Sequence, residues 1–256
     1  MILKSIGSCF AVQYIGWFLA TFARTEKFYD LTGSLTFIGL TAYNIVAKQR
    51  CSLRQNIQAV CVISWATRLG AFLFYRVLLS GGDRRFAKIK TSPLKFFFAW
   101  TMQGIWITMC LYPSLRLWSK TETSATDSLT IRDKIGYSLW TVGFLLQVAA
   151  DYQKFRFNQN PANKGSFIHS GLWSVVRHPN YLGEIIMWSS LWLTASGSFR
   201  SRREFATVVC PLFVIWLLTK LSGVPLLEQR ALKKWGHLTE FQQYMQSTRR
   251  LVPGIW

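Results

Sequence analysis

Apolar runs of about 17 to 23 residues recur along the whole chain, and short polar, mostly basic segments separate them. A run of this length is what an α-helix needs to cross the hydrocarbon core of a bilayer. The pattern therefore predicts an all-α, multi-pass membrane protein that forms one integral-membrane domain over residues 1–256. The predicted spans, about seven in number, are residues 6–22, 31–47, 57–79, 93–113, 131–151, 180–198 and 205–221.

After the last predicted span the pattern becomes amphipathic. Between Pro225 and Met245 the apolar residues are spaced for one helix face, and charged residues occupy the other positions. This pattern predicts a C-terminal amphipathic helix that lies along the membrane surface. Its apolar positions are Leu226, Leu227, Leu232, Trp235, Leu238, Phe241 and Tyr244.

The chain is strongly basic, with 30 Lys and Arg against 11 Asp and Glu and a net charge of +19. In a soluble protein this balance would suggest nucleic acid as a partner. Here the charges lie between apolar spans, so we expect them to face membrane lipids and not nucleic acid. The five cysteines are scattered without a paired motif, which predicts no disulfide framework and no metal site.

One stretch gathers most of the candidate chemistry, Arg177-His178-Pro179-Asn180-Tyr181-Leu182-Gly183-Glu184, directly before an apolar segment. Ionisable groups at membrane depth usually mark a binding or catalytic site. Asn180 and Glu184 are four residues apart and so share one helix face. Pro179 is suited to the first helical position, which places Arg177 and His178 at a helix N-terminus, where anions bind.

Further polar groups lie at the end of the fifth predicted span. Gln147 is a single amide within this span, of the kind that usually makes a hydrogen bond between helices. Asp151 ends the span and is followed by Lys154 and Arg156. Asp151 is therefore either a headgroup-level carboxylate neutralised by Lys154, or an acceptor for a hydroxyl or amide of a ligand.

Taken together, these motifs resemble those of the steroid 5-alpha-reductase-like membrane proteins. The closer branch is a set of largely uncharacterised relatives that share the family's C-terminal domain. The resemblance covers residues 55–256, and residues 1–54 are N-terminal spans with weak resemblance. It is carried by Thr67-Arg68-Leu69-Gly70, residues 81–86, Gln103-Gly104, residues 151–154, Asn163-Lys164-Gly165, residues 171–184, and the ending Phe241, Tyr244 and residues 248–253.

This resemblance implies a reductase in the endoplasmic-reticulum membrane of a eukaryote. Its cofactor would be NADPH, and hydride would pass to the carbon β to the ketone of a conjugated, lipid-like small molecule. The cofactor residues that it implies are Gln147, Asp151, Asn180, Tyr181, Glu184 and Tyr244. Further phosphate partners, suggested by their chemistry, are Lys154, Arg156, Lys164, Arg177 and His178. No pattern in the chain indicates an oligomeric state.

The family's catalytic pair is missing from this sequence. In the steroid reductases a Glu of the second span and a Tyr of the third polarise the ketone. Here no Asp or Glu lies between Asp30 and Asp83, and Trp65 stands at the position that matches the Tyr. The catalytic residues therefore stay open, and the candidate donors are Tyr43, Asn44 and Tyr75.

Two other functions compete with the reductase. Isoprenylcysteine carboxyl and phospholipid methyltransferases share an Arg-His-Pro-x-Tyr-x-Gly helix start and a later helix headed by acids. Glu228 could supply such an acid, with S-adenosylmethionine as the cofactor, although Gln229 stands where a second acid is usual. The missing Glu and Tyr also allow a non-catalytic lipid-binding protein on the same fold.

Overall fold

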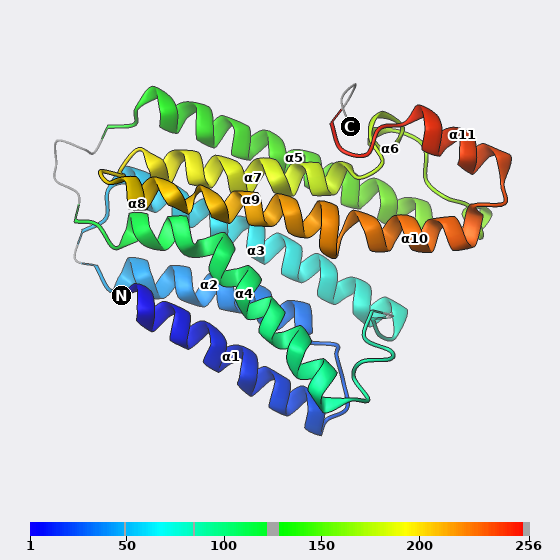
Figure 1. Cartoon of the computed structure of the whole chain (residues 1–256), viewed down its shortest axis with the longest axis horizontal. Helices are drawn as coiled ribbons and strands as arrows, with labels where there is room; N and C mark the ends of the chain where they lie inside the picture. Colours follow the sequence, from blue (N-terminus) through cyan, green and yellow to red (C-terminus); the bar gives the residue numbers. More distant parts are fainter. Residues whose placement is uncertain (49, 84, 122–127, 253–256) are drawn as a thin grey trace. The chain divides into compact units, whose positions relative to one another are not determined.

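A computed structural model describes residues 1–48, 50–83, 85–121 and 128–252 (Figure 1). These residues form helices joined by short turns, and one isolated parallel bridge joins Val176 to Arg249. The all-α class predicted from the sequence is confirmed. Two residues of the motifs above, Arg84 and Pro253, lie outside the described residues.

A helix covers each of the first six predicted spans, and the seventh is a series of shorter helical pieces. The long helices are α1 (Ile2–Phe22), α2 (Tyr29–Val46), α3 (Leu53–Ser80), α4 (Pro93–Trp118), α5 (Ile131–Gln159) and α7 (Pro179–Ser196). The shorter elements are η2 (Pro161–Asn163), α6 (Leu172–Val175), α8 (Arg202–Phe205), η3 (Ala206–Val208), α9 (Val209–Trp216), the π-helical η4 (Leu217–Leu221), α10 (Val224–Trp235) and α11 (Thr239–Ser247).

Four helical stretches among the described residues are long and apolar enough to cross a membrane. They are Ile2–Phe22, Leu53–Ser80, Pro93–Trp118 and the composite stretch Arg202–Trp235. The other long helices carry more polar residues, such as Asn180 and Glu184 on α7. An integral-membrane protein is consistent with these lengths, and the count of seven spans stays a prediction.

The chain divides into two compact units. The first comprises Met1–Asp133 and Trp192–Cys210, and the second comprises Lys134–Leu191 and Pro211–Trp256. In the first unit α1 packs against α4, and α2 packs along α3. Fully buried Trp100 on α4 anchors an aromatic cluster there with Phe96 and Phe86.

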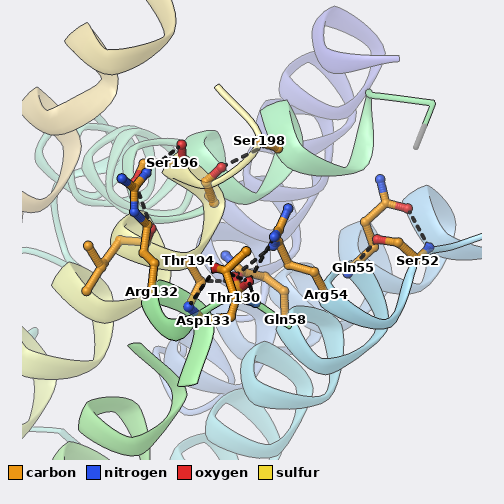
Figure 2. Close-up of polar contacts among 12 residues, drawn as sticks. Ser52, Arg54, Gln55, Gln58, Thr130, Arg132, Asp133, Thr194, Ser196 and Ser198 are labelled. Atoms are coloured by element: carbon orange, nitrogen blue, oxygen red, sulfur yellow. Dashed lines mark hydrogen bonds and ion pairs between the residues drawn. The ribbon is translucent and has the colours of Figure 1, made fainter. Parts of the chain in front are cut away.

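A buried polar network ties the first unit together (Figure 2). Arg54, in the first turn of α3, donates from Nε and Nη2 to Asp133 over 2.7 and 2.8 Å. The same carboxylate accepts hydrogen bonds from the backbone and hydroxyl of Thr130. Gln58, one turn further along α3, donates to Ser114 and accepts from Thr194. Arg54 is 5% exposed and Asp133 is 0% exposed, so each charge depends on the other.

Replacing Asp133 by Ala is expected to lower the free energy of unfolding by about 3–5 kcal/mol, because the buried Arg54 guanidinium would lose the carboxylate that accepts from its Nε and Nη2 atoms. The measurement is denaturant unfolding of the detergent-solubilised chain. The double variant Arg54→Met, Asp133→Leu removes both charges and should recover most of that loss. An Asp133→Ala variant as stable as the unmodified chain would show that the pair does not hold these elements.

Ion pairs join the loop between α3 and α4 to Glu26 and Asp30, which lie just before and at the start of α2. Glu26 accepts hydrogen bonds from Lys90 (2.7 Å) and from the backbone N–H of Asp83 (3.0 Å). Burial raises the pKa of Glu26, but these hydrogen bonds outweigh it and hold that pKa below its ordinary value. Arg85 pairs with both Asp83 and Asp30. The cations of this basic loop are therefore partly neutralised within the first unit.

In the second unit, α5 and α7 lie side by side and run in opposite directions (Figure 1). Two glycines allow their backbones to touch. A Cβ built on Gly183 would lie 2.5 Å from the carbonyl oxygen of Gly143, and one built on Gly143 would lie 2.7 Å from that of Gly183. Real Cβ atoms do not approach that closely, so any larger residue here would push the helices apart.

The C-terminal segment differs from its prediction. Where the sequence predicts one amphipathic helix over residues 225–245, the structure has two, α10 and α11. The first ends at Gly236, and the extended backbone of Leu238 prevents its continuation. Phe241 is 2% exposed and packs edge-on against Phe167, so part of the apolar face of α11 covers protein within the second unit.

Candidate functional site

Four polar side chains form two cross-helix pairs in the second unit, and we call them the α5–α7 row: Gln147, Asp151, Asn180 and Glu184. Gln147 Nε2 donates to Glu184 Oε2 over 3.0 Å, and Asn180 Nδ2 donates to Asp151 Oδ1 over 3.1 Å. The spacing of four residues on each helix places both pairs on the facing surfaces. The glycine contact described above brings these surfaces within hydrogen-bonding reach.

The row is rich in acceptors, and its Gln147–Glu184 pair is buried, whereas Asp151 and Asn180 are half-buried. Gln147 is 2% and Glu184 is 7% exposed. The Oδ1 atom of Asn180 is buried and has no hydrogen-bond partner among the described residues. An unpaired buried acceptor is costly, so this atom can accept a hydrogen bond from an N–H or O–H group that reaches it.

The cations before α7 meet a carboxylate that lies 50 residues later in the chain. Arg177 Nη2 lies 3.1 Å from Glu228 Oε1, and His178 Nε2 lies 3.4 Å from the same atom. Arg250 reaches the other oxygen of Glu228 at 3.3 Å. Two guanidinium groups thus share one carboxylate, and the cluster keeps a positive charge.

The backbone around this cluster is also engaged. The N–H groups of Arg177 and His178 donate to the carbonyls of Arg249 (2.8 Å) and Arg250 (3.1 Å). These two amides are therefore not available to an anion. The Nε atom of Arg177 is a buried donor with no hydrogen-bond partner among the described residues, so this side chain can still take an anionic oxygen.

Stability should depend on pH through His178. Burial lowers the pKa of His178 and outweighs the opposing contact with Glu228, while Lys154 and Arg177 lower it further. The unfolded chain therefore binds a proton more readily, and stability is complete above the ordinary value of 6.5 and is lost as the pH falls through the folded pKa. The slope should reach at most about 1.4 kcal/mol per pH unit, and denaturant unfolding between pH 7.5 and 5 measures it.

The variant His178→Gln supplies the control for this pH dependence. It should flatten the fall in stability below pH 6.5, because its side chain does not titrate. If the unmodified chain and His178→Gln lose stability in parallel, His178 is not the group responsible.

Two other predicted cofactor residues, Tyr244 and Lys154, contact Trp173, and a third, Tyr181, contacts His178. The hydroxyl of Tyr244 donates to the carbonyl of Trp173 over 2.7 Å, and burial raises the pKa of Tyr244 to about 12. Lys154 Nζ lies 4.3 Å from the centroid of the Trp173 ring, a cation–π contact. The ring of Tyr181 stacks on the ring of His178, and the angle between the two ring planes is 16°. These residues share the second unit with the α5–α7 row.

Lys164 and Arg156 are exposed. Lys164 follows η2, and Arg156 lines an open cavity that is described below.

The candidate donors for a ketone belong to the first unit. Tyr43 on α2 is 48% exposed, and Tyr75 on α3 is 54% exposed. Asn44 is buried, and its Nδ2 donates to Ser5 and to the carbonyl of Leu40, so it has a structural role. Trp65 is buried against Phe37. No group of three or more His, Cys, Asp or Glu among the described residues could hold a metal ion.

A family model described as "Protein of unknown function (DUF1295)" matches residues 16–248. The chain belongs to this DUF1295 family. A 3-oxo-5-alpha-steroid 4-dehydrogenase 1 of Macaca fascicularis is 27% identical over 225 residues, which cover 87% of this chain and 76% of the relative. The probable O-methyltransferase ustE of Ustilaginoidea virens is 37% identical over 62 residues, 24% of this chain, and the match spans only 22% of that relative. No solved structure matches the chain.

One member of the cationic cluster in this DUF1295 chain, Glu228, was not predicted to belong to it. The sequence predicts Glu228 at a charged position of the amphipathic helix or as an acid of a methyltransferase helix, whereas the structure pairs it with Arg177 and Arg250. A signal was present, because Glu228 is an acid at the start of an otherwise basic amphipathic segment. Nothing in the sequence, however, joins residue 228 to residue 177.

Proposed function

We propose that the chain is a membrane oxidoreductase that uses NADPH to reduce the C=C bond of an apolar enone, sterol-like or derived from a fatty acyl chain. The similarity to a steroid dehydrogenase extends over 87% of the chain, which includes the α5–α7 row. A dehydrogenase that acts beside a ketone catalyses, in reverse, the reduction of an enone. In a eukaryotic cell we expect the enzyme in the endoplasmic-reticulum membrane.

The observation that carries the proposal is the buried, acceptor-rich row beside a cationic cluster. The carboxamide and hydroxyl groups of NADPH are donors that would satisfy Asn180 Oδ1, and the carboxylates of Asp151 and Glu184 are further acceptors for such groups. Its phosphates are anions, and Arg177 Nε is a buried donor without a hydrogen-bond partner among the described residues. The residues present therefore fit this cofactor, with Lys154, Lys164 and Tyr244 as further partners.

NADPH, when bound, supplies a hydride that goes to the carbon β to the ketone, and it becomes NADP⁺. The negative charge that develops on the ketone oxygen needs a hydrogen-bond donor, and a proton must reach the α carbon. The α5–α7 row would orient the cofactor and exclude water. For the donor we propose a side-chain hydroxyl, with Tyr43 and Tyr75 as candidates.

The second candidate is an S-adenosylmethionine-dependent methyltransferase. Its support is the short match to a probable O-methyltransferase, together with Glu228 beside Arg177 and His178. The match spans less than a quarter of either protein, so we rank it below the reductase.

The proposal is tested by hydride transfer to lipid enones. The full chain in lipid nanodiscs is given NADPH labelled with deuterium at the transferred position and a panel of conjugated sterol and acyl ketones. We expect one saturated product that carries one deuterium on the β carbon. If no enone in the panel consumes NADPH while methyl transfer from S-adenosylmethionine is seen, the second candidate takes its place. Absence of both activities with retained lipid binding favours the non-catalytic protein.

A further inference from the structure

An open cavity of about 770 Å³ lies where the last turns of α5 meet residues 160–171, within the second unit. Small-molecule sites in proteins have volumes of this order. The residues that line it include Tyr152, Gln153, Arg156, Phe157, Asn160 and Ile168.

The cavity faces away from the α5–α7 row. Successive residues of an α-helix are turned by about 100°, so Gln147, Asp151 and Lys154 lie within about 60° of one another. On the same scale Tyr152, Gln153 and Arg156 cluster on the opposite side of α5. Arg156 and Lys154 are close in the sequence, but Arg156 therefore lies on a different face of α5.

The wall of the cavity is positive and rich in donors. Of the described residues that line it, Arg156 alone carries a charge. The oxygen of Gln153 already accepts from the backbone of Leu172 (2.9 Å), and that of Asn160 accepts from Ala162 (3.0 Å). The amide groups of Gln153 and Asn160 thus have their NH₂ donors to offer, and together with the guanidinium of Arg156 they favour an anion.

Apolar groups complete the wall. Tyr152, Phe157 and Ile168 can pack against the ring or chain of an amphiphile. The donors of Arg156, Gln153 and Asn160 alone exceed what the two oxygens of a carboxylate require, whereas a phosphate ester has more oxygens to offer. We propose that this cavity binds a phosphate ester, with Arg156 and the two amides on the phosphate and the apolar wall on the rest of the ligand.

This inference goes beyond the proposed function, since it concerns a second surface of α5. The phosphate has two sources, a phospholipid headgroup or a nucleotide such as NADP⁺. Both sources carry the phosphate that Arg156 and the two amides would bind. One binding experiment with different probes distinguishes them.

The experiment measures binding to the full chain in nanodiscs of uncharged lipid. The probes are dihexanoyl phosphatidic acid, NADP⁺ and NAD⁺, with dihexanoyl glycerol as a ligand without phosphate. Arg156→Ala should weaken binding of at least one phosphate probe about tenfold or more, and Arg156→Lys should weaken it less. Arg156 is exposed, so neither variant is expected to disturb folding.

Lys134→Ala is the matched control, because it removes one exposed cation from the same helix about 33 Å away. Loss restricted to phosphatidic acid identifies a lipid site. Weaker binding of NADP⁺ alone, with NAD⁺ binding unaffected, identifies the phosphate that distinguishes NADP⁺ from NAD⁺ as the group bound by Arg156. If Arg156→Ala weakens no phosphate probe more than Lys134→Ala does, the proposal is overturned, and this result leaves the test with deuterated NADPH unaffected.

Discussion

Glu184→Gln should weaken NADPH binding by about 10- to 100-fold. The substitution keeps the shape of the side chain and removes one charged acceptor from a buried position, where a hydrogen bond to a charged group contributes about 1.5–3 kcal/mol. Glu184 is 7% exposed and receives the amide of Gln147, so little solvent can compensate. Asn180→Ala should have an effect of similar size, because it removes the buried Oδ1 atom that has no hydrogen-bond partner among the described residues.

Glu240→Gln is the control for this prediction. Glu240 is an exposed carboxylate on α11 in the same unit, and the substitution makes the same change of charge. The measurement is the dissociation constant of NADPH by fluorescence titration of each purified variant. Equal constants for Glu184→Gln, Asn180→Ala and Glu240→Gln would remove the α5–α7 row from the cofactor site.

Gly183→Val should lower stability by about 1–3 kcal/mol or more and abolish cofactor binding together with it. A Cβ at this position would lie 2.5 Å from the carbonyl oxygen of Gly143 and 2.9 Å from the backbone nitrogen of Gln147. Both obstacles are backbone atoms, so the helices themselves must separate. Their separation would lengthen the Gln147–Glu184 hydrogen bond and the Asn180–Asp151 hydrogen bond at the same time.

The matched control is Gly39→Ala on α2, where a Cβ would meet nothing within 4 Å. There the substitution should be neutral or stabilising, since alanine has the higher helix propensity. Thermal unfolding in detergent micelles and NADPH binding are measured on both variants. A Gly183→Val variant with unchanged unfolding and binding would contradict the close approach of α5 and α7.

The parts of the fold that depend on local pattern could be read from the sequence. Apolar runs of membrane-spanning length predicted the long helices among the described residues, and the four-residue spacing placed Asn180 and Glu184 on one face. Asp151 and Gln147 were recognisable as candidate site residues because polar groups in or at the end of an apolar span are costly, but the sequence did not predict their pairing with Asn180 and Glu184. The structure brings these four residues together.

The parts that depend on distant pairs could not be read in the same way. Arg54 and Asp133 are 79 residues apart and leave no local trace of their contact. Glu228 meets Arg177 across 51 residues of chain for the same reason. The break between α10 and α11 was missed because an apolar stripe continues across it, and the extended backbone of Leu238 marks the change.

The central claim is that the α5–α7 row and its cationic neighbour bind NADPH. The most direct measurement titrates one nanodisc preparation of the full chain with NADPH and, in parallel, with S-adenosylmethionine. The account predicts saturable binding of NADPH that Asn180→Ala weakens, and no saturable binding of S-adenosylmethionine. Saturable binding of S-adenosylmethionine with none of NADPH would contradict it and would assign the site to methyl transfer.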